Sequence, residues 1–247
     1  MIAPERPWNE FVPEIVASTA ETDRPVLIVG EPGTGKDLLA RLIHAGSKRR
    51  GGPFVKATCR ADAREKIDAE LFGHGAGANR EVGHRRLGSV DFAHTGVMFV
   101  KGAHDLPQSA RDSLCRLVET RAFSRIGSDH RVVIDVRLIA GAARPLDAVP
   151  GGVAWRDRLL DLGLLEIRVP PLRDRKEEIP ILAESFLAEF AAWYGRRVVL
   201  SSETMSLFSE YAWPGNVGEL RKIVRGLVVN GGPQQIHDEI RERQGST

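Results

Sequence analysis

Residues 30–37, Gly-Glu-Pro-Gly-Thr-Gly-Lys-Asp, have the types and spacing of a phosphate-binding loop. Glycines allow successive backbone N–H groups to point at phosphate oxygens, and the amino end of a following helix adds a positive dipole. Lys36 would contact the terminal phosphates as a point charge, and Asp37 stands where a magnesium-binding Ser or Thr is usual. The predicted nucleotide site comprises Gly30, Glu31, Pro32, Gly33, Thr34, Gly35, Lys36 and Asp37.

The second half of a phosphoryl-transfer site is expected after a later apolar strand, where acidic residues hold magnesium and orient the attacking water. This chain has Lys101 and Gly102 after the apolar run 97–100. A protonated lysine cannot ligate a metal, and glycine supplies no general base. At ~4 Å and an effective dielectric constant near 20, two unit charges interact with an energy of about 4 kcal/mol. A lysine that repels the metal ion, in place of a carboxylate that attracts it, is therefore a large change. We therefore predict that nucleotide binds, with Lys101 added to the site, and that hydrolysis is not supported.

The elements around the loop have the order that phosphate binding requires, strand then loop then helix. A continuous apolar run over 25–30 predicts a buried strand, and residues 37–44 predict the helix. Further strands are expected at 53–57, 96–100, 132–140 and 164–169, with helices between them that include 8–20 and 108–120. This alternation predicts an α/β fold with a parallel sheet.

The pattern changes at Pro170, beyond which only helices are predicted. They are expected at 179–194, 202–211 and 217–228. Ser201 or Ser202 is a candidate N-cap, and the Pro-Gly-Asn turn at 214–216 is expected to cap the last helix. We predict two subdomains, an α/β nucleotide-binding part at 1–170 and a helical lid with a polar tail at 171–247.

Size and composition indicate a globular protein of one large domain, or of one large and one small. The chain has 247 residues, 42% of them apolar, and a formal net charge of +2 that points to neither nucleic acid nor membrane. Cys59 and Cys115 form no zinc-binding pattern and no disulfide framework. No apolar run is long enough to span a bilayer, so a reducing cytoplasm is expected.

Ordered motifs along most of the chain resemble the AAA+ central domain of bacterial enhancer-binding proteins, ATPases that activate transcription by sigma-54 RNA polymerase. An acidic residue after the loop lysine is usual in that family, which accounts for Asp37. The matching segments are 30–37, 53–59, 70–74, 85–88, 135–140, 170–175, 179–180 and 213–217. The resemblance implies a P-loop NTPase fold with a parallel sheet flanked by helices, a C-terminal all-helical lid, and ATP or ADP as cofactor.

At the family's functional positions the chain departs from the pattern. The acidic pair that anchors magnesium and polarises water is Lys101-Gly102. The nearby His104 and Asp105 fall on the family's ordinary G-E-L-P turn, so they are weak substitutes. The Thr-Asn sensor becomes Ala142-Ala143, and the arginine after W-P-G-N-V becomes Gly218.

Two regions that act on other molecules in the family also differ. The loop that contacts the sigma factor has the sequence Gly-Ala-Asn-Arg-Glu-Val at 77–82, in place of GAFTGA. Two arginines act on a neighbouring subunit's nucleotide in the family. The ungapped register gives Trp155 and Asp161 instead, while a one-residue gap restores Arg156; Arg158 is a further candidate.

Together these departures predict a module that binds ATP or ADP without efficient hydrolysis and regulates transcription or binds a protein partner. That partner would be transcription machinery or a related AAA+ subunit. No catalytic residue or metal ligand is assigned, and magnesium is in question. Two alternatives stay open, an active ATPase that remodels sigma-54 RNA polymerase and a nucleotide-free scaffold. Direct DNA binding and membrane binding are not expected, and the oligomeric state is open.

Overall fold

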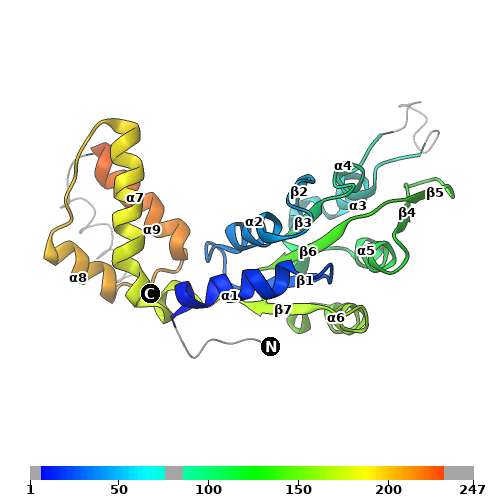
Figure 1. Ribbon diagram of the computed structural model, residues 1–247, viewed down its shortest axis with the longest axis horizontal. Coiled ribbons are helices and arrows are strands. Elements are labelled where there is room, and N and C mark those ends of the chain that lie inside the picture. Colours follow the sequence, from blue (N-terminus) through cyan, green and yellow to red (C-terminus); the bar gives the residue numbers. More distant parts are fainter. Residues whose placement is uncertain (1–6, 76–85, 231–247) are drawn as a thin grey trace. The chain divides into compact units, whose positions relative to one another are not determined.

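The computed structural model describes residues 7–75 and 86–230, and its contacts group them into two compact units (Figure 1). The sheet unit contains Phe11–Gly30 and the described part of Lys36–Arg168. The helical unit contains residues 7–10, 31–35 and 169–230. The middle of the phosphate loop therefore groups with the helices. The division into subdomains at 1–170 and 171–247 stays a prediction.

The sheet unit is built on five parallel strands in the order β2-β3-β6-β1-β7. Their bounds are β1 Val26–Val29, β2 Phe54–Thr58, β3 Val97–Lys101, β6 Arg137–Ala142 and β7 Leu165–Arg168. In the register, Val29 lies opposite Ala142, and Lys101 lies opposite Gly141. The end of β1 and the end of β3 therefore reach the same edge of the sheet. The predicted parallel α/β fold is confirmed.

Helices flank this sheet because its central strands are apolar on both faces. They are α1 Trp8–Ala20, α2 Lys36–Gly46, α3 Arg64–Phe72, α4 Ser89–Phe92, α5 Gln108–Thr120 and α6 Gly152–Asp161. Met98 and Val100 belong to a buried core shared with α3, α5 and α6. Successive strand residues point to opposite faces, so Phe99 faces the other way and stacks on Phe54 with ring centroids 6.0 Å apart. Lys101 shares the face of Phe99.

The single strand predicted at 132–140 is wrong, because the structure has two strands there. β5, Arg131–Val133, pairs with the antiparallel strand β4, Ala122–Ser124, whereas β6 belongs to the large sheet. Between them the Asp135 carboxylate accepts hydrogen bonds from Arg49 and Arg121. The chain thus leaves one ladder and enters another at Asp135, a charged residue within an otherwise largely apolar segment.

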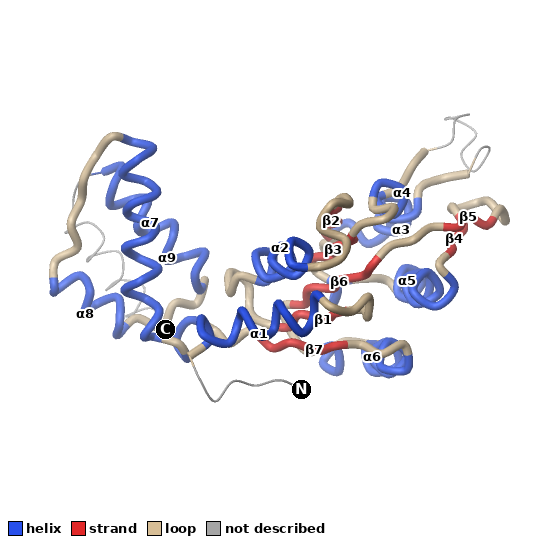
Figure 2. The backbone as a smooth tube through the Cα atoms, viewed as in Figure 1, coloured by secondary structure: helices blue, strands red, loops and turns tan. Residues whose placement is uncertain are grey.

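The helical unit has no strand within the residues described (Figure 2). Its helices are α7 Ile179–Tyr194, α8 Ser202–Glu210 and α9 Asn216–Asn230, packed around a core that includes Phe208 and Trp213. Ser201 is the N-cap of α8, since its hydroxyl accepts a hydrogen bond from the Thr204 N–H at 3.1 Å. No helix in the described part of the chain combines the length and apolar character of a bilayer span.

A turn precedes α9, as predicted, and the helix begins at Asn216. The Asn216 side chain accepts a hydrogen bond from the Leu172 N–H at 2.7 Å and donates to the Pro32 carbonyl at 3.0 Å. Glu219 accepts from the Gly215 N–H at 2.7 Å. The asparagine is thus used for contacts far away in the sequence.

Candidate nucleotide-binding site

The phosphate loop leaves the sheet at the end of β1 and re-enters the sheet unit at α2. The Gly30 N–H donates to the Ala142 carbonyl at 3.1 Å, which continues the β1–β6 pairing by one residue. The buried Lys36 Nζ donates to the Gly30 carbonyl at 2.5 Å. The loop is therefore closed by its own lysine, whose ammonium lies where the first and last residues of the loop meet.

Two glycines give the loop a backbone that other residues rarely adopt. Gly33 has φ +80° and Gly35 has φ +103°. A Cβ at Gly33 would lie 2.1 Å from the Gly215 carbonyl oxygen, so a side chain is excluded there by contact as well as by conformation. Left-handed residues in such a loop are typical of the backbone nests that bind anions.

Within the helical unit, two arginines hold the middle of the loop. Arg173 donates to both Glu31 carboxylate oxygens, at 2.9 and 2.5 Å. Arg175 is buried and donates to the Thr34 carbonyl at 2.8 Å and to Glu178 at 3.0 Å. Burial lowers the pKa of Arg175, against the opposing effect of Glu178. The contacts of Arg173 with Glu31 and of Arg175 with Thr34 span more than a hundred residues of sequence and were not predicted.

Asn216 and Gly218 complete this set of contacts. The Asn216 amide donates to Glu31 at 3.1 Å, in addition to Pro32. The Gly218 N–H donates to the Gly33 carbonyl at 3.2 Å. Gly218, where the family carries an arginine, thus contacts the loop through its backbone. Its motif marked the position, but the sequence contained no signal for the partner.

At the carboxyl edge of the sheet, Asp37 lies between two lysines. Its carboxylate accepts a hydrogen bond from Lys101 Nζ at 3.2 Å and another from Lys56 Nζ. Lys56 lies opposite Phe99 in the register, so both lysines project from the same face, toward the first turn of α2. Lys56 was missed by sequence reasoning, and its place two residues after Phe54 in a strand is the signal that could have found it.

The charges of this cluster do not cancel. Burial alone would raise the pKa of Asp37, but the hydrogen bonds from Lys56 and Lys101 outweigh it and hold the pKa below its ordinary value. The carboxylate is therefore ionised at neutral pH and faces two ammonium groups. In the described residues, no three His, Cys, Asp or Glu side chains converge in the way that a metal ion requires.

Gly102 is required by the backbone that follows β3. It has φ +80°, and a Cβ there would lie 2.2 Å from the Cys59 carbonyl oxygen. A side chain at this position would need the β2 and β3 ends to move apart. Burial raises the pKa of the Cys59 thiol to about 12, so this cysteine is not a nucleophile at neutral pH.

The other predicted positions have structural partners. His104 Nδ1 accepts from the Ala143 N–H at 3.2 Å, and its Nε2 lies 3.6 Å from Asp105, which fits a turn. Arg156 pairs with Glu166 at 3.0 Å.

Arg158 lies 3.6 Å from Asp112 and 3.4 Å from Glu119, and Trp155 is buried. Both candidate arginines thus have acidic partners in their own chain. The region at 77–82, expected to differ from the family's sigma-contacting loop, lies outside the described residues.

Comparison with known proteins agrees with this geometry. A family model described as the Sigma-54 interaction domain matches residues 3–161, and one described as the AAA+ ATPase lid domain matches residues 173–242. The regulatory protein AtoC of Escherichia coli strain K12 is 37% identical over 220 residues, which are 88% of this chain and 48% of AtoC. NtrX of Azorhizobium caulinodans is 37% identical over 213 residues, 85% of this chain and 46% of that protein.

Solved structures show the same fold. NtrX from Brucella abortus in complex with ADP has a TM-score of 0.81 and 28% identity, covering 94% of this chain and 52% of the NtrX chain. The same protein in complex with ATP has the same TM-score and identity. The chain spans about half the length of the curated relatives it matches. It belongs to the Sigma-54 interaction domain family of AAA+ proteins, and the two family models together match its α/β part and its lid.

Proposed function

We propose that this domain binds ATP or ADP at the phosphate loop, does not hydrolyse ATP efficiently, and regulates transcription by presenting a nucleotide-dependent surface to a protein partner. The observation that supports it most directly is Lys101 at the end of β3, bonded to Asp37, in the place of the family's magnesium-anchoring carboxylate. The complexes of NtrX with ADP and ATP support the choice of nucleotide.

The loss of hydrolysis follows from the chemistry of the two residues after β3. Phosphoryl transfer depends on charge stabilisation and on a group that orients the nucleophile, and one missing stabiliser can reduce the rate by several orders of magnitude. Lys101 cannot bind magnesium while protonated, and Gly102 has no side chain to orient water. The backbone of Gly102 also disfavours any replacement by a longer residue.

The output of binding is proposed to pass through the loop contacts of the helical unit. Glu31 and Thr34 accept hydrogen bonds from Arg173 and Arg175. A phosphate bound in the nest attracts the two arginines and competes with Glu31 and Thr34 for their N–H donors. Binding of nucleotide therefore changes the hydrogen bonds that hold the loop. The partner is proposed to be sigma-54 transcription machinery or a related AAA+ subunit, in the cytoplasm.

Two assays test this function. Calorimetric titration with ADP and ATP should show binding, and Lys36→Ala should remove it, because its ammonium closes the loop. A phosphate-release assay should show no turnover above background. Turnover near ~1 per second would establish the active ATPase instead.

The scaffold alternative has its own signature in a stability measurement. Nucleotide at roughly 100 times its Kd should raise the free energy of unfolding by about 2.7 kcal/mol. If ATP leaves the unfolding of the wild-type protein and of Lys36→Ala equally unchanged, the loop does not bind nucleotide and the scaffold reading replaces ours.

A further inference from the structure

We infer that Lys101 replaces the divalent metal ion, so that the loop binds the nucleotide di- or triphosphate without magnesium. This inference rests on the proposed nucleotide binding and specifies the form of the ligand. It predicts a site in which the Lys101 ammonium contacts phosphate oxygens and supplies the counter-charge that a metal ion would otherwise provide.

The register of the sheet places Lys101 at the correct edge and depth. Lys101 lies opposite Gly141 on β6, and the next residue of β6, Ala142, lies opposite Val29 on β1. The loop begins directly after Val29. Lys101 ends β3, which is two strands from β1 in a sheet whose neighbouring strands are about 4.8 Å apart. Along the strand direction, Lys101 is level with Ile28, close to the point where the loop begins.

Lys56 is less well placed for the same task. It lies opposite Phe99, two residues before the end of β3, and on the strand beyond β3. It is therefore both deeper along the sheet and one strand further from β1 than Lys101. Both lysines donate to Asp37, but Lys56 lies further from the phosphate loop than Lys101. Lys56 is therefore the matched control.

The charge balance leaves Lys101 able to change partner. Asp37 provides one negative charge to two lysines, so the cluster has an excess positive charge before Lys36 is counted. Lys101 is 44% exposed, and a lysine has a flexible four-carbon stem with three rotatable donors. Because Lys56 stays with the carboxylate, Lys101 can exchange a carboxylate oxygen for a phosphate oxygen without leaving Asp37 unpaired.

Magnesium does not fit the residues at this edge. It favours octahedral oxygen ligands, usually one or two carboxylates with phosphates and water. The carboxylate beside Lys101 is Asp37, which already accepts hydrogen bonds from two ammonium groups. A metal ion would have to displace Lys101 and would then remain next to its positive charge.

The test measures ADP affinity of the purified chain in EDTA and in millimolar magnesium. The inference expects the two Kd values to agree within about threefold, since the metal adds no contact. It also expects Lys101→Met to weaken binding in EDTA by about 10-fold to 100-fold, the loss of one charge-assisted hydrogen bond, and Lys56→Met to weaken it less.

Lys101→Asp gives the opposite outcome in the same assay. It places a second carboxylate beside Asp37, so binding should be lost in EDTA and recovered with magnesium. Circular dichroism checks that each variant is folded, and the wild-type comparison stands even if a variant is not. Wild-type binding that requires magnesium, or equal losses for Lys56→Met and Lys101→Met, would overturn the inference.

Failure of the inference is distinct from failure of the proposed function. If the wild-type protein binds ADP only with magnesium, the nucleotide site is real and the role of Lys101 is wrong. If it binds ADP under neither condition, nucleotide binding itself is wrong, and the inference falls with it.

Discussion

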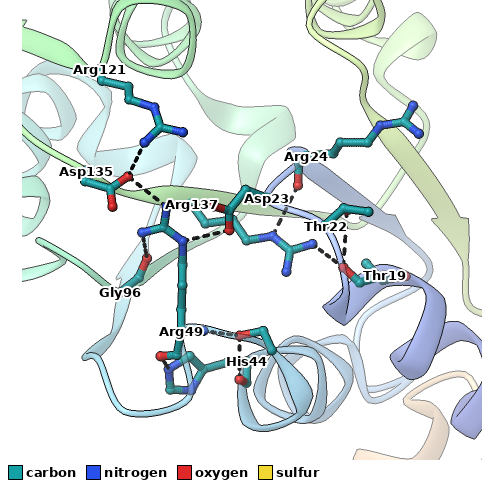
Figure 3. Close-up of polar contacts among 11 residues, drawn as sticks. Thr19, Thr22, Asp23, Arg24, His44, Arg49, Gly96, Arg121, Asp135 and Arg137 are labelled. Atoms are coloured by element: carbon teal, nitrogen blue, oxygen red, sulfur yellow. Dashed lines mark hydrogen bonds and ion pairs between the residues drawn. The ribbon is translucent and has the colours of Figure 1, made fainter.

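At the amino edge of the sheet a buried arginine meets two aspartates, whereas at the carboxyl edge two half-exposed lysines share one. Arg49, 9% exposed, donates to both oxygens of Asp23 at 2.8 and 3.0 Å and to Asp135 at 2.7 Å (Figure 3). Arg121 also donates to Asp135, at 3.0 Å. Arg49 and Arg121 are thus matched by two carboxylates, whereas Lys56 and Lys101 share Asp37 alone.

The two clusters differ in the residue that carries the positive charge, and this difference corresponds to a difference in function. Asp23 and Asp135 precede β1 and β6, so Arg49 ties together the starts of two neighbouring strands with a rigid planar fork. Arg137, buried in the same region, donates to the carbonyls of Thr19 and Arg24 (Figure 3). These donors have structural partners. The two lysines of the other edge are partly exposed and outnumber their one carboxylate partner, which suits a site that receives an anion.

The largest expected effect is on stability at the amino edge. Arg49→Met should lower the free energy of unfolding by about 2–3 kcal/mol, because Asp23 loses its arginine donor, Asp135 keeps only Arg121, and the buried packing of the Arg49 side chain is lost. Denaturant titration measures this value. The control is Arg60→Met, whose partner is Asp62 and whose side chain is 71% exposed; it should cost less than about 0.5 kcal/mol. Equal losses for the two variants would contradict a structural role for the amino-edge cluster.

Acid should weaken the same cluster. Hydrogen bonds from Arg49 hold the pKa values of Asp23 and Asp135 below the ordinary value, against the opposing effect of burial. Carboxyls with a depressed pKa add stability above the unfolded pKa of about 3.8 and lose it as the pH falls through the folded value. Both aspartates are partly exposed, so solvent screening limits the contribution to about 1 kcal/mol. The Tm, measured by thermal unfolding from pH 6 downward, should fall less steeply in Arg49→Met than in the wild-type protein.

A smaller effect is expected from removing the shared carboxylate at the carboxyl edge. Asp37→Asn takes away the charge that competes with phosphate for Lys101, so ADP affinity in EDTA should rise by about threefold, equivalent to roughly 0.7 kcal/mol. Fluorescence titration with a labelled ADP measures the change. Weaker binding in this variant would mean that Asp37 itself assists the ligand and that the two edges are more alike than we argue.

The smallest effect is that of Lys101 on folding. Lys101→Met should change the free energy of unfolding by less than about 0.5 kcal/mol, because a half-exposed pair gains little and Lys56 continues to pair with Asp37. The same denaturant titration used for Arg49→Met reports it. A loss of stability as large as that of Arg49→Met would show that Lys101 stabilises the fold, and the two edges would then not differ in function.

Four features could be predicted from the residues alone: the parallel α/β fold with its helical lid, the family, the phosphate loop, and Lys101-Gly102 after an apolar strand. These features depend on short-range patterns, namely runs of apolar residues, glycines at fixed spacing and motifs in order. The same patterns predicted a single strand at 132–140, although Asp135 interrupts the apolar residues where the chain passes from one sheet to the other.

Which charged side chains pair with each other depends on the folded chain. Asp37 pairs with Lys101 across 64 residues, and Arg49 with Asp135 across 86. The grouping of residues 31–35 with the helical unit and the steric need for Gly102 likewise depend on distant segments. A charge in a sequence has no fixed partner until folding brings strand ends and helix starts together, and that partner separates a structural ion pair from a ligand site.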